Sequence, residues 1–99
     1  MSRGSIAFQV LPLYTEEKRS LAAIDRAIAH IQAQQDIHMS VGAFETTLEG
    51  EFARLMQVLE EAVVIAGENG EDIFVNVKLR YHKEGEMLTS EDKLAKYRS

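Results

Sequence analysis

The spacing of hydrophobic residues along this chain changes in a fixed order, and that order limits the fold more than any other feature. A spacing of two residues, typical of half-buried strands, covers residues 5–13, 36–44, 45–50 and 72–82. A spacing of three and four, typical of amphipathic helices, covers residues 15–34 and 51–66. The sequence therefore predicts the order strand, helix, strand, strand, helix, strand.

Residues with special backbone or capping properties lie between these segments. Pro12 cannot donate to a strand ladder and marks the predicted end of the first strand. Thr15 offers a capping hydroxyl to the first helix. A turn at Gly42 joins the second and third strands, and Gly67 or Gly70 supplies a left-handed residue that stops the second helix.

This order predicts an α+β protein with a ferredoxin-like βαββαβ sandwich. We expect a four-stranded antiparallel sheet, in the order 4-1-3-2, with both helices on one face. The 99 residues suit one domain, with its core at residues 5–82, a tail at 83–99 and a short helix at 90–98. The expected helix-facing residues are Ile6, Phe8, Val10, Met39, Val41, Leu48, Ile73, Val75, Val77 and Leu79.

Composition and charge argue against several classes of function. The chain has 11 Lys and Arg against 16 Asp and Glu, and this net charge of −5 does not suit nucleic acid. The absence of cysteine excludes disulfides, a thiol nucleophile and thiolate metal sites. No apolar run approaches the roughly 20 residues of a membrane-spanning helix, and no signal peptide is recognisable. We expect a cytoplasmic protein.

No catalytic or metal site is predicted either. His30, His38 and His82 fall on different elements without metal-ligand spacing. The chain lacks a nucleophile–base pair and a glycine-rich phosphate loop, so we expect no enzymatic activity. An RNA-binding sheet would need aromatic rings on its two central strands, where this chain has only aliphatic, polar and acidic side chains.

The uncovered face of the predicted sheet carries amides and hydroxyls instead. We expect Gln9, Asn76 and Thr47 to lie side by side across three strands, with Glu49 and Lys78 one step along. Amides offer paired donors and acceptors that suit a flat heterocycle, and a neighbouring carboxylate suits an amine or a cation. An ordinary polar face that forms a subunit interface explains the same residues, and both interpretations stay open.

Three stretches of the sequence resemble one known family. These are AFQVLPL at residues 7–13, VGAFETTLEG at residues 41–50 and VKLR at residues 77–80. Together they resemble the thiamine-binding protein family, small ferredoxin-like proteins of bacteria and archaea long catalogued as of unknown function. The resemblance extends from about Ile6 to about Lys93.

The resemblance implies binding of thiamine or its hydroxymethylpyrimidine part, with no catalysis and no other cofactor. It also implies homodimers or homotetramers formed through the sheet faces. The alternative is a homo-oligomeric regulatory or interaction module without a small ligand. The matched ligand-binding positions are Gln9, Pro12, Thr46, Thr47, Glu49 and Lys78, and Asn76 is added from the sheet geometry.

Overall fold

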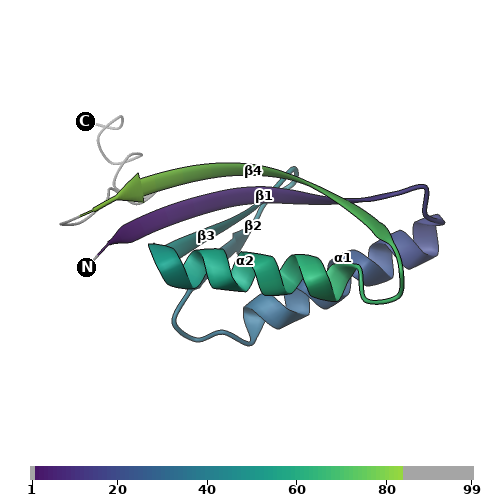
Figure 1. The fold of residues 1–99 in the computed structure, drawn as a ribbon, viewed down its shortest axis with the longest axis horizontal. Coiled ribbons are helices and arrows are strands. Elements are labelled where there is room, and N and C mark those ends of the chain that lie inside the picture. The colour runs from purple at the N-terminus through teal and green to yellow at the C-terminus, as the bar shows by residue number, and fades with distance from the viewer. Residues whose placement is uncertain (1, 84–99) are drawn as a thin grey trace.

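The computed structural model describes residues 2–83, which form a sheet with two helices on one side (Figure 1). The elements in chain order are β1 (Arg3–Leu13), α1 (Glu17–Gln32), β2 (His38–Val41), β3 (Thr46–Glu51), α2 (Phe52–Ala66) and β4 (Asp72–His82). The sheet is antiparallel with the order β2-β3-β1-β4, which reads 4-1-3-2 from the β4 edge. The predicted α+β fold with four antiparallel strands and two helices is confirmed.

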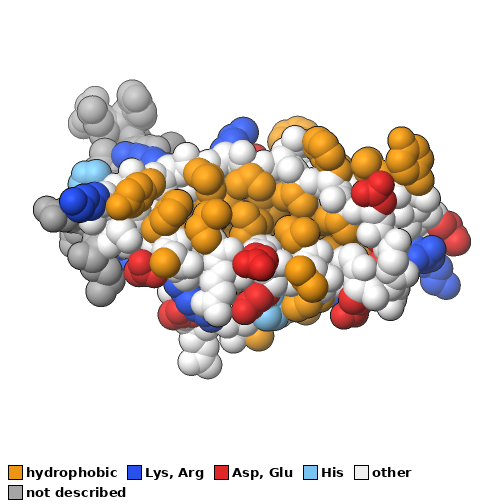
Figure 2. All heavy atoms as spheres, viewed as in Figure 1, with side chains coloured by type: hydrophobic (Ala, Val, Ile, Leu, Met, Phe, Trp, Pro, Cys, Tyr) orange, Lys and Arg blue, Asp and Glu red, His pale blue; other side chains and the backbone are white. Residues whose placement is uncertain are grey.

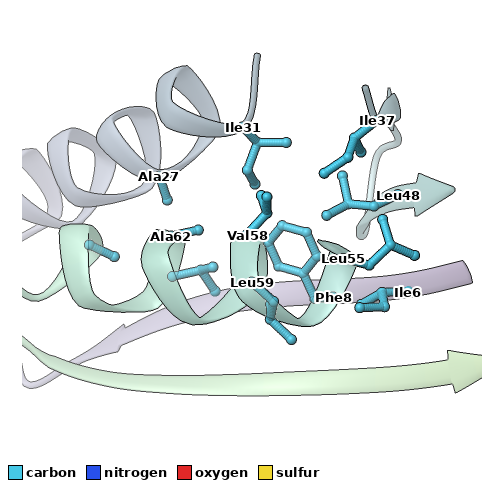
Figure 3. Close-up of a cluster of buried hydrophobic side chains, with 12 residues drawn as sticks. Ile6, Phe8, Ala27, Ile31, Ile37, Leu48, Leu55, Val58, Leu59 and Ala62 are labelled. Atoms are coloured by element: carbon cyan, nitrogen blue, oxygen red, sulfur yellow. The ribbon is translucent and has the colours of Figure 1, made fainter. Parts of the chain in front are cut away.

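The hydrophobic core lies between the sheet and the helices (Figure 3). Ile6 and Phe8 of β1 and Leu48 of β3 point toward the helices because alternate residues of a strand share a face. They meet Leu55 and Val58 of α2, which lie one helical turn apart. The rest of this cluster comprises Val10, Ala27, Ile31, Ile37, Leu59, Ala62 and Ala66.

The strand and helix starts differ from the prediction in two places. β1 begins at Arg3 and not at residue 5; it ends at Leu13 as predicted, and Pro12, next to that end, lies opposite Ile73 of β4. Because β3 pairs with β1 only as far as Phe8, the missing N–H of Pro12 interrupts no ladder on that side. Thr15 does not cap α1, because its hydroxyl donates to the Leu13 carbonyl at 2.7 Å and Glu16 occupies the cap position.

The second helix is capped by the residue that ends β3. The Glu51 carboxylate accepts hydrogen bonds from the backbone N–H groups of Ala53 and Arg54. Gly67 closes the helix in a right-handed conformation, and Gly70, with a φ of 89°, is the left-handed glycine of the following turn. Of the two glycines considered for the left-handed position, the structure selects Gly70.

Three of the expected helix-facing residues lie on the predicted side of the sheet but are not buried there. Val41, Val77 and Leu79 are 61%, 41% and 53% exposed. Val77 and Leu79 do share the helix-facing side, since they lie opposite Phe8 and Ile6 of β1. They remain exposed because β4 and β2 are the sheet edges, and the helices cover mainly the two central strands.

The predicted short helix at residues 90–98 lies outside the described residues, as does the tail beyond Lys83. Within residues 2–83, neither α1 nor α2 is long and apolar enough to cross a lipid bilayer.

Candidate functional site

The open face of the sheet is organised in rows that the strand pairing fixes. In one row, Gln9 of β1 lies directly opposite Asn76 of β4. We call these two residues the amide pair. Opposed residues of neighbouring antiparallel strands have Cβ atoms about 4.5–5.5 Å apart, so one small molecule can contact both amides.

The next two rows contain small residues at the centre and larger polar or charged residues at the sides. Ala7 of β1 lies between Thr47 of β3 and Lys78 of β4, and Ser5 lies between Glu49 and Arg80. Successive rows are about 7 Å apart, because two residues separate side chains of the same face. The small side chains of Ser5 and Ala7 leave a shallow floor along β1 that leads away from the amide pair.

A half-open pocket of about 550 Å³ lies over the amide pair. Its walls come from β1, from β4 and from the turn between β2 and β3. The lining residues are Gln9, Phe44, Glu45, Asn76, Val77 and Lys78. This volume falls within the range of small-molecule sites, roughly 300–1,000 Å³.

The turn that forms one wall of the pocket is connected to β4. The Gly42 N–H donates to the Glu45 carbonyl at 2.9 Å and closes the turn. The Glu45 carboxylate lies 3.4 Å from the Lys78 Nζ, across β1. This ion pair between Lys78 and Glu45 connects the turn to β4.

Phe44 is the residue of this site that the sequence reasoning missed. Its ring is 85% exposed, yet it lines the pocket beside the amide pair. Large aromatic side chains usually bury their surface, so an exposed ring at a pocket rim is a candidate stacking partner for a flat ligand. The signal was present in the sequence, because Phe44 is part of the matched central motif VGAFETTLEG and lies at its predicted turn.

The structure brings some of the predicted site residues together and separates others. Gln9, Asn76 and Lys78 line the same pocket. Thr47 lies in the row of Lys78 and not in the row of the amide pair, so the expected row of three polar side chains is wrong. Glu49 lies two rows from the amide pair, about 14 Å along the sheet.

Two other predicted residues lie away from the pocket. Thr46 points toward the helices, is buried and lies opposite Phe8 of β1. Adjacent strand residues point to opposite faces, so Thr46 and Thr47 cannot both contact a ligand on the open face. Pro12 belongs to the far end of β1, beyond Leu11, and does not line the pocket.

Charge is divided across the open face by strand. β3 and its preceding turn carry Glu45 and Glu49, while β4 carries Lys78 and Arg80. The floor of β1 between these two sides is uncharged at Ser5 and Ala7. Beside the pocket, a ligand with a positive group therefore meets a carboxylate on the β3 side, since the Asp72 carboxylate lies at the other end of β4, opposite Leu13.

The remaining charged clusters of the described chain serve the fold. Glu71, whose side chain is almost fully buried, lies 3.0 Å from the Arg26 guanidinium at the start of β4. Backbone N–H groups, its own first, and Arg26 hold the pKa of Glu71 below its ordinary value. Within residues 2–83 no group of three or more histidine and acidic residues is arranged to hold a metal ion.

These features define a small α+β protein with a polar, aromatic-rimmed pocket on the open face of its sheet. The thiamine-binding protein family model matches residues 6–98. The chain therefore belongs to the thiamine-binding protein family, as the resemblance in the sequence predicted.

Several known proteins are similar to this chain over nearly its whole length. A UPF0045 protein of Clostridium perfringens is 30% identical over 99% of this chain and 100% of its own length. A solved structure from Streptococcus pneumoniae is 44% identical, covers 94% of this chain and 98% of its own, and has a TM-score of 0.77. A Thermotoga maritima structure, described as a proposed thiamine biosynthesis/salvage protein, is 29% identical over 97% of this chain and 99% of its own, with a TM-score of 0.78.

Proposed function

We propose that this protein binds thiamine or its hydroxymethylpyrimidine part at the amide pair, without converting it chemically. The observation that carries this proposal is the pocket in which Gln9 and Asn76 lie opposite each other, with the exposed Phe44 lining the same pocket. An aminopyrimidine ring is flat and presents donors and acceptors along one edge. Two amides can pair with such an edge while an aromatic ring stacks on its face.

The rows of the open face suggest how the rest of thiamine lies. With the pyrimidine at the amide pair, the thiazolium ring extends over Ala7 and Ser5, where the side chains are small. Its positive charge then approaches Glu49 on the β3 side. The ion pair between Lys78 and Glu45 supports this arrangement, because Glu45 offsets the lysine charge that would repel the ligand.

Hydrogen bonds of this kind support moderate affinity. Each neutral hydrogen bond contributes about 0.5–1.5 kcal/mol and a charged one about 1.5–3 kcal/mol. Three or four such bonds with a stacked ring are compatible with micromolar binding, about −8 kcal/mol, before the cost of ordering the ligand.

Self-association through the open faces is part of the same proposal. The acidic residues on the β3 side and the basic residues on the β4 side make this face complementary to itself under a two-fold rotation. A face-to-face dimer of this kind encloses the pocket between two sheets. If the partner's face fills the pocket instead, the protein is an interaction module without a small ligand.

Titration calorimetry separates these two functions. We expect heat of binding with thiamine and with hydroxymethylpyrimidine, and a loss of affinity of about 5-fold or more for both ligands in Asn76→Leu. Ser40→Ala is the matched control, because Ser40 is an exposed polar residue of the open face on the distant edge strand β2. The absence of heat at millimolar ligand, with a dimeric protein, would leave only the interaction module.

A further inference from the structure

The two arginines of the open face differ from the other arginines of the chain. The part of the chain that the structure describes contains five arginines, and Arg19, Arg26 and Arg54 contact carboxylates. Arg3 and Arg80 are exposed and form no ion pair with any described carboxylate. We call these two residues the arginine pair. A guanidinium group without an internal partner can bind an external anion.

The strand pairing places the arginine pair close together. Ser5 of β1 lies opposite Arg80 of β4, and Arg3 lies opposite His82 in the next row. Arg3 and Arg80 are therefore diagonal neighbours, whose side chains begin about 7–8 Å apart. In Figure 2, basic side chains in blue and histidine in pale blue lie together at the end of the molecule where β1 begins and β4 ends in Figure 1. Two long arginine side chains can reach one group from such positions.

The nearest carboxylates of β3 do not neutralise the arginine pair. Glu51, opposite Arg3, uses its carboxylate to accept two backbone N–H groups at the start of α2. Glu49 is separated from Arg80 by the width of β1. The two guanidinium groups therefore create a positive potential at this end of the open face, although the whole chain has a net charge of −5.

The arginine pair lies at the end of the shallow floor that begins at the amide pair. The row of Arg80 is about 14 Å from the amide pair along the sheet, and Arg3 lies one row further. Between them, β1 presents only the small side chains of Ala7 and Ser5 on this face. The Ser5 hydroxyl, opposite Arg80, is a further hydrogen-bond donor. An elongated ligand that starts at the amide pair and follows this floor therefore ends beside the arginine pair.

We propose that the arginine pair binds the phosphate group of a thiamine phosphate ester, with Ser5 as an additional donor. This inference rests on the proposed function, because it extends the same ligand along β1. The hydroxyethyl group of thiamine is attached to the thiazolium ring, so a phosphate ester formed there lies at the end of the molecule farthest from the pyrimidine.

The charges of the open face match the charges of such an ester. A phosphate monoester carries about −1.5 to −2 charges at pH 7 and accepts several hydrogen bonds, which suits two guanidinium groups. Glu49 lies on the side of the positive thiazolium ring, and the arginine pair lies beside the negative phosphate. The site therefore favours the phosphorylated ligand over free thiamine.

Titration calorimetry of the full chain at low salt tests this preference. We expect thiamine monophosphate to bind about 10-fold more tightly than thiamine, since the phosphate adds charged hydrogen bonds. Arg80→Gln should lower this ratio of affinities at least about 3-fold, because one of two guanidinium groups is lost. Lys18→Gln is the matched control, since it removes one positive charge from an exposed position of α1. It should keep the ratio of the unmodified chain.

A shorter ester tests the position of the phosphate. In the phosphate ester of hydroxymethylpyrimidine, the phosphate stays next to the pyrimidine and does not reach the arginine pair. Arg80→Gln should therefore weaken this ester much less than it weakens thiamine monophosphate. An equal loss for both esters would contradict a phosphate site at the arginine pair, because it would show only a long-range effect of charge.

Two further results separate this inference from the proposed function. Equal affinity of the unmodified chain for thiamine and for thiamine monophosphate would overturn the inference and leave the proposed function intact. The arginine pair would then meet carboxylates of a second copy and not a ligand phosphate. No heat of binding with either ligand would overturn the proposed function, and this inference with it.

Discussion

The two side chains of the amide pair form a candidate binding site because of the residues around them. An exposed glutamine opposite an exposed asparagine is ordinary on a polar sheet. Here the pair shares a pocket with Phe44, which belongs to a turn whose Glu45 contacts Lys78. A flat ligand can therefore be bound on its edge by amides and on its face by an aromatic ring.

Replacing Phe44 tests the stacking role. We expect Phe44→Ala to weaken hydroxymethylpyrimidine binding about 3- to 10-fold, which is the usual range for one aromatic contact. Phe44→Trp should retain binding. Because the chain contains no tryptophan, this variant also reports the ligand by a change in fluorescence.

Tyr14→Ala is the control for this prediction. Tyr14 is also a fully exposed aromatic residue, but it lies at the end of β1, with a φ of 51°, and does not line the pocket. Equal loss of affinity in Tyr14→Ala and Phe44→Ala would show that the effect is not a stacking contact in the pocket.

At the scale of elements, α2 contributes more to the core than any other segment. Its buried residues recur every three or four positions and pack on β1 and β3. We expect Leu55→Ala to lower the free energy of unfolding by about 2–5 kcal/mol, because it leaves a cavity against the sheet. Val64→Ala, an exposed position of the same helix, should change it by less than about 0.5 kcal/mol in urea unfolding.

The turn between α2 and β4 makes stability depend on pH. The pKa of Glu71 is lowered in the folded protein by backbone N–H groups and Arg26, so the folded state favours the charged carboxylate. Stability is then complete above the ordinary glutamate pKa of about 4.3 and falls as the pH drops through the lower folded value.

Melting temperatures measured between pH 7 and pH 3 test this dependence. Glu71→Gln should lower the melting temperature at pH 7 and reduce its decline on acidification. Glu68→Gln is the control, because Glu68 also contacts Arg26, at 3.1 Å, but is half exposed. A pH profile of Glu71→Gln identical to that of the unmodified chain would contradict the role of the buried carboxylate.

The sequence predicted the strands and helices more accurately than the exposure of their side chains or the register between strands. The last strand, residues 72–82, was predicted with the observed bounds because its alternation is uninterrupted. Alternation shows which face a side chain takes but not whether anything covers that face, so the exposure of Val77 and Leu79 was missed. The row of Thr47 was also wrong, because β1 and β3 are not joined by a hairpin, so no turn between them shows their register in the sequence.

At the scale of the whole molecule, two strands of the sheet and the turn between β2 and β3 form one pocket on the open face. Three neighbouring residues of β4 line this pocket, namely Asn76, Val77 and Lys78. The sequence indicated the amide pair and the family, whereas Phe44 and the division of charge across three strands emerge only when the strands are paired.

The distance between the amide pair and Glu49 predicts a difference between two ligands. Glu49→Gln should weaken thiamine binding about 2- to 5-fold at low salt, since it removes a partially solvated charge contact with the thiazolium. Hydroxymethylpyrimidine, which lacks that ring, should bind with unchanged affinity. Calorimetry with both ligands measures this ratio, and an equal loss for both would contradict the proposed direction of the ligand along β1.

The most direct test is a crystal structure of the full chain grown with hydroxymethylpyrimidine. The account predicts the pyrimidine edge within hydrogen-bond distance of Gln9 and Asn76, with the ring of Phe44 stacked on its face. A ring bound at another place, such as beside Glu49 or on the outer surface of α2, would contradict it.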